Sequence, residues 1–213
     1  MKRHLPNYFR FFICQRLQIA NLPYMSSHHV VREKQEPALL VLGLDNFSDE
    51  LLGQLLEWSP TVIVTQLTAE KVNAYGIKID WVIANEVDES LQSDIKLMPA
   101  GNDTLAEAAM KYLVTYNYPA VNIVTDHLQL KDYLFYIDKI NMVIFHGDKK
   151  IYAINSGFSK WKPAGEIIEL LSEPQHFHFS GLENIEGNRF KTTHDGFFSL
   201  QFEQPFLFIA EDL

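Results

Sequence analysis

The stretch Ile79–Ser90, with the sequence IDWVIANEVDES, joins a short apolar run to an acidic segment. The run Asp80–Ala84 predicts a buried strand, and Glu86, Asp88 and Glu89 follow it directly. In an open parallel sheet, ligands bind beyond the carboxyl ends of the strands. Carboxylates gathered at such an end are candidates for binding Mg²⁺ and, through it, phosphate. A solvated acidic loop is the alternative, because such loops are common on protein surfaces.

Strand and helix patterns alternate on both sides of this stretch. Apolar or β-branched runs predict further strands at Ala38–Gly43, Thr61–Thr65, Ile95–Met98, Ala120–Val124 and Met142–Phe145. Capping residues and helical spacing predict helices after Ser48, through Glu70–Tyr75, from Thr104 to about Tyr116, and over Asp126–Ile137. The alternation predicts an α/β N-terminal domain, a parallel sheet with flanking helices, over residues 37–145.

The pattern changes at His146. Short strand-like runs then follow one another, separated by turns, at Ile151–Asn155, Glu166–Leu171, His176–Phe179, Arg189–Thr193, Phe197–Phe202 and Pro205–Ala210. No helix of normal length is predicted in this part of the sequence. Residues 146–213 therefore read as a small all-β sandwich or barrel domain that follows the α/β domain.

The first 24 residues differ in composition from the rest. They carry Lys2, Arg3, Arg10 and Arg16 and contain no acidic residue. Arg10 interrupts their apolar run, which argues against a secretory signal. We expect residues 1–36 to be a leader, disordered or an upstream extension before a natural start at Met25.

Composition narrows the class of protein. The 213 residues are 47% hydrophobic and carry a formal net charge of −9, which fits a globular fold and argues against a nucleic-acid partner. The single cysteine, Cys14, excludes an internal disulfide and fits a reducing, cytoplasmic location. No apolar run is long enough to span a membrane. Neither a P-loop nor a GxGxxG pattern occurs.

Two further groups of polar residues are candidate ligands. Asn102 and Asp103 directly precede a predicted helix, where they could cap it or face a metal ion. His176 and His178 would share one face of a strand, and His194 is a third imidazole, yet packing or solvation explains them equally well.

Trp161 stands beside a turn in the sequence SKWKPAG. Its ring could stack on a flat ligand, although packing is its ordinary role. The phenylalanines of the C-terminal half are best explained as a packed β core.

Taken in order, these landmarks resemble the thiamine pyrophosphokinase family over about residues 38–210. The family has a Gly-Asp-x-Asp-Ser motif after its third strand, an acidic helix start before an alanine-rich helix, an Arg-x-Asp-His-like helix, and, in its sandwich, a Gly-x-x-Ser-Leu strand and a Gly-Leu-x-Tyr turn. The similar segments here are Asn85–Glu89, Gly101–Ala108, Thr125–Tyr133, Gly165–Ile168 and Ser180–Glu183.

The resemblance implies transfer of a pyrophosphoryl group from ATP to thiamine, with Mg²⁺ as cofactor, to give thiamine diphosphate and AMP. It implies catalytic roles for Asp88, Asp103 and Asp132, and metal binding by Glu86, Asp88 and Asp103. Cofactor- and substrate-binding residues would be Asn102, Trp161, Thr193 and His194. It also implies a homodimer whose site combines the α/β domain of one subunit with the sandwich of the other.

The sequence departs from the family at several of these positions. Asn85 stands where the family has glycine, and Leu130 stands at the arginine position. The first change restricts close approach of the backbone to phosphate, and the second removes a bidentate cation from phosphoryl transfer. These losses favour a second hypothesis: an inactive family member that binds thiamine, thiamine diphosphate or a nucleotide for sensing or regulation.

Overall fold

A computed structural model describes residues 36–85 and 95–213 of the chain. The expected leader before Met25 and the acidic residues Glu86, Asp88 and Glu89 lie outside these described residues.

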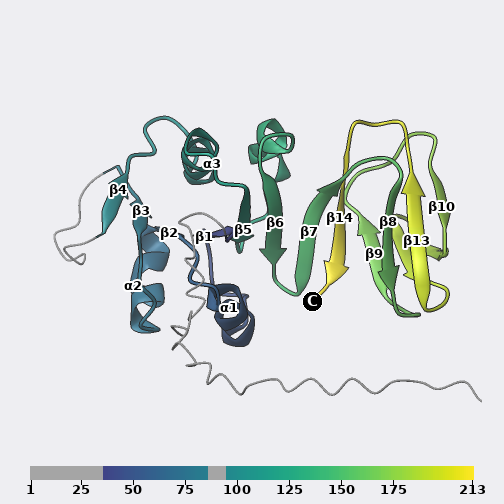
Figure 1. Cartoon of the computed structure of the whole chain (residues 1–213), viewed down its shortest axis with the longest axis horizontal. Coiled ribbons are helices and arrows are strands. Elements are labelled where there is room, and N and C mark those ends of the chain that lie inside the picture. The colour runs from purple at the N-terminus through teal and green to yellow at the C-terminus, as the bar shows by residue number, and fades with distance from the viewer. Residues whose placement is uncertain (1–35, 86–94) are drawn as a thin grey trace, which may run out of the picture. The chain divides into compact units, whose positions relative to one another are not determined.

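Six parallel strands form one half of a large sheet (Figure 1). They are β1 (Ala38–Val41), β2 (Val62–Thr65), β3 (Trp81–Ile83), β4 (Lys96–Met98), β5 (Ala120–Val124) and β6 (Asn141–His146). Their order in the sheet is β6-β5-β1-β2-β3-β4, and every neighbouring pair is parallel. The strands predicted in this half of the sequence are confirmed, since apolar runs this short and this buried have few other solutions.

Three α-helices connect these strands: α1 (Asp49–Leu56), α2 (Gln66–Ala74) and α3 (Leu105–Thr115). Ser48 caps α1 by accepting a hydrogen bond from the backbone N–H of Leu51. A capping box starts α3, in which Thr104 Oγ1 accepts from Glu107 N and Glu107 accepts from Thr104 N. The predicted starts of both helices are confirmed.

The helix expected over Asp126–Ile137 is wrong. The chain forms two short 3₁₀ helices instead, η1 (Leu130–Asp132) and η2 (Leu134–Tyr136). Asp126 is the residue that would start a regular helix. Its carboxylate instead accepts hydrogen bonds from backbone N–H groups of the loop after β1. Tyr133 and Tyr136 are both buried, and their spacing of three residues suits the 3₁₀ geometry.

The C-terminal part extends the same sheet with antiparallel strands and adds a second sheet. The extending strands are β7 (Lys149–Ile154), β14 (Leu207–Asp212), β9 (Ile167–Leu170), β12 (Arg189–Thr192) and β11 (Leu182–Glu186), in this order from β6. The second sheet contains β8 (Phe158–Lys162), β13 (Gly196–Gln201) and β10 (His178–Ser180), with β13 in the middle. The first sheet is therefore an eleven-stranded mixed sheet.

Two of these strands were not predicted from the sequence. β11 is a polar, largely exposed strand that pairs only with β12, so it lacks the apolar pattern of a buried strand. β8 carries lysines between its aromatic residues and stands before a proline and a glycine, which suggested a turn.

The core follows the two sheets. Side chains from β9 and β14 of the large sheet pack with Phe198 and Leu200 of β13 in one buried cluster, so the second sheet covers this part of the first. The large sheet continues without a break from β6 to β7, across the boundary expected at residues 145 and 146. The division into two domains stays a prediction. None of the described helices is long and apolar enough to cross a membrane.

Candidate functional site

The loops that follow β3 and β4 are joined at the carboxyl edge of the parallel strands. Asn85 follows β3, and its Oδ1 accepts a hydrogen bond from the backbone N–H of Gly101 at 2.9 Å. Gly101 has a φ of +61°, a conformation that glycine adopts at little cost. The side chain of Asn85 thus fixes the turn after β4. Asn85 consequently lies beside the turn that carries Asp103.

Asp103 lies in this turn, directly before α3, and is not the residue that caps the helix. Thr104 makes the cap, while Asp103 Oδ2 forms an ion pair with Lys111 Nζ at 2.5 Å. The hydrogen bond that Lys111 donates to Asp103 raises the pKa of Lys111. The Asp103 side chain remains 34% exposed, so a carboxylate with one cation beside it faces the edge where ligands bind. Asn102, its neighbour, is exposed.

Asp132 lies in η1, on the connection from β5 to β6. Burial raises the pKa of the adjacent Tyr133, and the negative charge of Asp132 raises it further. Among the residues that the structure describes, no hydrogen bond or ion pair joins Asp132 to Asp103. Their assignment to one catalytic group stays a prediction.

The switch point of the parallel sheet lies between β1 and β5, where the order of the strands reverses. Asp126 follows β5, and its carboxylate accepts hydrogen bonds from the loop after β1. The donors are the backbone N–H groups of Asp45 at 2.9 Å and Asn46 at 3.0 Å, and the side-chain amide of Asn46 at 3.3 Å. Burial would raise the pKa of Asp126, but these donors outweigh burial and lower it.

Gly43 makes room for this carboxylate. A Cβ atom at position 43 would lie 2.3 Å from Asp126 Oδ2 and 2.7 Å from the backbone nitrogen of Asp126. The backbone nitrogen cannot turn away as a side chain can, and the carboxylate is held by its hydrogen bonds, so a larger residue would push the two loops apart. The two consecutive backbone amides at the switch point therefore bind an anion that the chain itself supplies.

A second group of candidate residues comes together in the C-terminal part. Trp161 of β8 is directly opposite Phe197 of β13, and their side chains are 52% and 68% exposed. Gly196 precedes Phe197, and a Cβ atom there would lie 3.2 Å from His194 Nε2. His194 Nδ1 in turn lies 2.8 Å from Thr193 Oγ1. The structure thus brings Trp161, Thr193 and His194 to one end of the second sheet.

The turn that carries His194 is tied to the turn after β8. Asp195 Oδ1 accepts a hydrogen bond from the backbone N–H of Ala164 at 2.8 Å. Thr192 Oγ1 donates to the carbonyl of Pro163 and accepts from the N–H of Glu166. These bonds hold an exposed aromatic pair beside an imidazole, an arrangement suited to a flat, polar ring.

The histidines considered for zinc do not form a strand pair. His176 has a φ of +48° and precedes β10, and its Nδ1 forms an ion pair with Glu203. Side chains at positions 176 and 178 therefore do not alternate as they would within one strand. Within residues 36–85 and 95–213, no group of three or more His, Cys, Asp or Glu side chains could hold a metal ion.

The two groups of candidate residues lie far apart along the sheet. Asp103 follows β4, the edge strand, whereas Trp161 lies in β8 of the second sheet, which packs on the antiparallel strands that begin at β7. Six strand steps of about 4.8 Å separate β4 from β7, on the order of 30 Å. One copy of the chain cannot bring both groups to one small ligand.

Comparison with known proteins gave matches of structure alone. No family model and no curated protein matches the chain. A thiamine pyrophosphokinase from Bacillus subtilis superimposes with a TM-score of 0.60 and 13% identity, covering 83% of this chain and 99% of that one. Yeast thiamin pyrophosphokinase gives 0.63 and 8%, covering 85% and 87%. The Geobacillus thermodenitrificans protein gives 0.62 and 12%, covering 83% and 97%.

The chain has the thiamine pyrophosphokinase fold. At identities of 8–13% the likeness concerns the fold, and it extends over nearly the whole length of each of these proteins. The resemblance of the ordered sequence landmarks to this family is confirmed at that level.

Within the thiamine pyrophosphokinase fold, sequence reasoning missed two residues that shape the candidate site. Asn85 was regarded only as a lost glycine, and Asp126 only as a helix start. A polar Thr125-Asp126 pair directly after a buried central strand was the available signal, because the carboxyl ends of such strands face the ligand edge. Its partner loop, 80 residues away in sequence, could not be inferred from local pattern.

Proposed function

We propose that this protein is a thiamine pyrophosphokinase-like enzyme that transfers a pyrophosphoryl group from ATP to thiamine, giving thiamine diphosphate and AMP. The observation that carries the proposal is the extent of the structural likeness, which covers 83–85% of this chain and 87–99% of three thiamine pyrophosphokinases. The proposed reaction takes place in the cytoplasm, as the sequence predicts.

Mg²⁺ would be held by Glu86, Asp88 and Asp103. Asp103 fits such a role chemically, because it is a partly exposed carboxylate at the ligand edge and Mg²⁺ prefers hard oxygen donors. A bound Mg²⁺ supplies positive charge to the phosphate oxygens. Lys111 forms an ion pair with Asp103. This ion pair would weaken when the Asp103 carboxylate also binds Mg²⁺.

Substrate binding would divide between the two groups of residues. Asn102 and Asp132 would contact ATP or orient the thiamine hydroxyl, while Trp161, Thr193 and His194 would bind the thiamine ring. Most of the catalytic effect would then come from positioning and from charge stabilisation of the transferred group.

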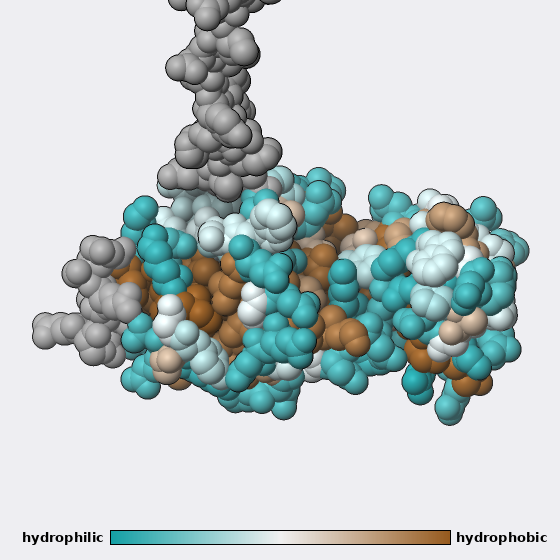
Figure 2. All heavy atoms as spheres, turned by 60° about the horizontal axis from the view of Figure 1, so that its bottom comes forward, coloured by the Kyte–Doolittle hydropathy of each residue, from teal (hydrophilic) through white to brown (hydrophobic). Residues whose placement is uncertain are grey.

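A homodimer would unite the two groups, since one copy holds them on the order of 30 Å apart along the sheet. The ligand edge exposes apolar side chains that could meet a second copy: Leu67 in the first turn of α2 is 90% exposed, and Leu105 at the start of α3 is 39% exposed. Figure 2, which turns the lower side of Figure 1 forward, shows apolar residues gathered over the half that contains the parallel strands.

A second candidate function is binding without turnover. The specific observation in its favour is the carboxylate of Asp126, which occupies the two backbone amides at the switch point where a phosphate group could otherwise bind. In that case thiamine, thiamine diphosphate or a nucleotide would bind for sensing or regulation.

The test is AMP formation from ATP in the presence of thiamine and Mg²⁺. We expect AMP to form only when thiamine is present and to fall at least tenfold in Glu86→Ala, because the proposed metal loses a carboxylate. AMP formation that is independent of thiamine, or equal in Glu86→Ala, would contradict the enzyme. Thiamine binding measured by calorimetry in the same samples, without AMP formation, would support the second candidate.

A further inference from the structure

A cavity of about 490 Å³ lies away from the ligand edge, against the amino-terminal halves of β5 and β6 and beside β7 and β8. Its volume is within the range of small-molecule sites. The cavity lies between two buried clusters of side chains that pack on the large sheet. Val143 packs on the edge of the buried cluster under α1 and α2, whereas Tyr152 packs on the edge of the cluster inside the sandwich.

Asn122 is an unusual residue for its position on the cavity wall. It stands in the middle of β5, which has parallel partners on both sides, and it faces Leu39 of β1 and Val143 of β6 in register. Asparagine is depleted in strands, and interior parallel strands are ordinarily apolar. The half-buried side chain of Asn122 forms no hydrogen bond with any described residue. No side-chain polar atom among the described residues is both buried and unpartnered, so the Asn122 amide is open to the cavity, where water or a ligand can bond to it.

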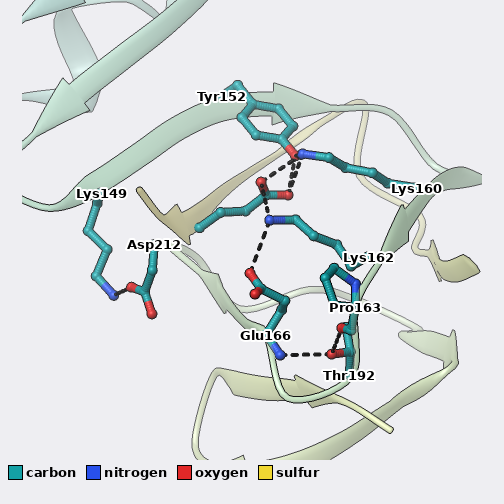
Figure 3. A network of polar contacts seen from close by, with 9 residues as sticks. Lys149, Tyr152, Lys160, Lys162, Pro163, Glu166, Thr192 and Asp212 are labelled. Carbon is teal, nitrogen blue, oxygen red and sulfur yellow. Dashed lines mark hydrogen bonds and ion pairs between the residues drawn. The ribbon is translucent and has the colours of Figure 1, made fainter. Parts of the chain in front are cut away.

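Two lysines line the cavity, and they differ in how their charges are compensated. Lys160 Nζ lies 2.8 and 2.7 Å from the two carboxylate oxygens of Glu211 and 3.1 Å from Tyr152 Oη. Figure 3 shows Tyr152 of β7 and Lys160 of β8 converging from the two sheets, with Lys162 below them reaching toward Glu166. Glu211 is 3% exposed and also pairs with Lys162 at 3.2 Å.

Lys150 is the second lysine that lines the cavity. It is directly opposite Glu211 in the pairing of β7 with β14, yet the Glu211 oxygens bond to Lys160, Lys162 and Tyr152. Among the residues that the structure describes, no carboxylate forms an ion pair with Lys150. The cavity therefore combines a lysine that has no ion-pair partner among the described residues, the side-chain amides of Asn122 and Asn155, and an apolar wall that includes Phe158 and Val143.

The geometry points to a binding site for a small organic carboxylate with a flat apolar body, separate from the proposed thiamine and ATP site. Lys150 binds the carboxylate, the amides of Asn122 and Asn155 bond to polar atoms of the ligand, and Phe158 packs on its ring. This site stands on the cavity alone and does not depend on the proposed function.

The probe is indole-3-acetate, compared with its neutral amide, indole-3-acetamide, and with the cation tryptamine. The full-length chain, labelled with ¹⁵N, is titrated without ATP, Mg²⁺ or thiamine, and the side-chain amide signals of Asn122 and Asn155 are followed. We expect saturable shifts of these two signals, with the acetate binding at least tenfold more tightly than the cation. The signal of Asn102, at the ligand edge, should not move.

Lys150→Gln should raise the dissociation constant of the acetate about tenfold, because the charge-assisted contact is lost. Lys131→Gln, which removes an exposed lysine of η1, should leave it unchanged. The absence of saturable binding by the wild-type chain at millimolar acetate would overturn the site. Equal affinity for the three probes, or shifts confined to Asn102, would overturn it as well, even if the Lys150 variant fails to fold.

Discussion

Glu211 is the most deeply buried charged side chain among the described residues. Its ionised form is stabilised by the groups that donate hydrogen bonds to its carboxylate. Burial alone would raise the pKa of Glu211, but hydrogen bonds from Lys160 and Tyr152, together with the charges of Lys160 and Lys162, lower it below the ordinary value of 4.5. Burial raises the pKa of Tyr152, and the bond to Glu211 raises it further. At neutral pH this group therefore contains a carboxylate, two ammonium groups and a neutral phenol.

Glu211→Gln should destabilise the protein at pH 7 by on the order of 2 kcal/mol, because two lysines lose their charged partner. Since the folded-state pKa lies below the unfolded one, the unfolded chain takes up the proton first as pH falls. The contribution of the carboxylate is thus complete above about pH 4.5 and is lost as pH falls through the folded-state pKa. Urea unfolding at several pH values measures it.

The difference in unfolding free energy between wild type and Glu211→Gln should shrink below about pH 4.5. Glu173→Gln is the matched control, because Glu173 is exposed and its carboxylate has no ion-pair partner among the described residues. A difference that stays constant from pH 7 to pH 3 would show that Glu211 is not held as a carboxylate.

Individual residues of the candidate site could be predicted from sequence only where their role is local. Asp103 was found because it precedes a helix start, and Thr104 makes that start recognisable. The contact of Asp126 with Asn46 joins two loops that are 80 residues apart, so no local pattern reveals it. The lack of an ion-pair partner for Lys150 among the described residues was equally invisible, since it depends on which partners Glu211 already has.

At the scale of elements, capping chemistry and apolar runs decided what could be predicted. The β-branched strand β2 and the capping box of α3 were readable because each depends on neighbouring residues. The helix expected after β5 was wrong because the carboxylate of Asp126, its expected first residue, accepts hydrogen bonds from the loop after β1. The polar edge strand β11 was not predicted, because an exposed strand lacks the run of apolar residues that marks a buried one.

Thr104→Ala should lower the unfolding free energy by about 1 kcal/mol, because it removes the hydroxyl oxygen that accepts a hydrogen bond from Glu107 N, whereas the backbone N–H at position 104 can still donate to Glu107. It should also loosen the turn that holds Asp103. Thr115→Ala is the matched control, since Thr115 is exposed at the last turn of the same helix. Thermal unfolding of the two variants measures the difference, and equal midpoints would contradict a stabilising cap.

At the scale of the whole molecule, the continuous sheet keeps the two groups of candidate residues apart. Asp103 lies beyond the edge strand β4, and Trp161 lies in the sheet that covers the opposite part. The order and register of these strands could not be derived from sequence patterns, which specify strands one at a time. The proposed site therefore needs a second copy of the chain, and a variant of either group should abolish activity.

Mixing two inactive variants tests the central claim most directly. Asp103→Asn and Trp161→Ala should each form little AMP from ATP and thiamine, whereas a refolded equimolar mixture should recover about a quarter of the wild-type rate, since half of the dimers would carry one intact site. A mixture of Asp103→Asn with Asp132→Asn, from the same half of the site, should recover nothing. A mixture of Asp103→Asn and Trp161→Ala that is no more active than either variant would contradict the account.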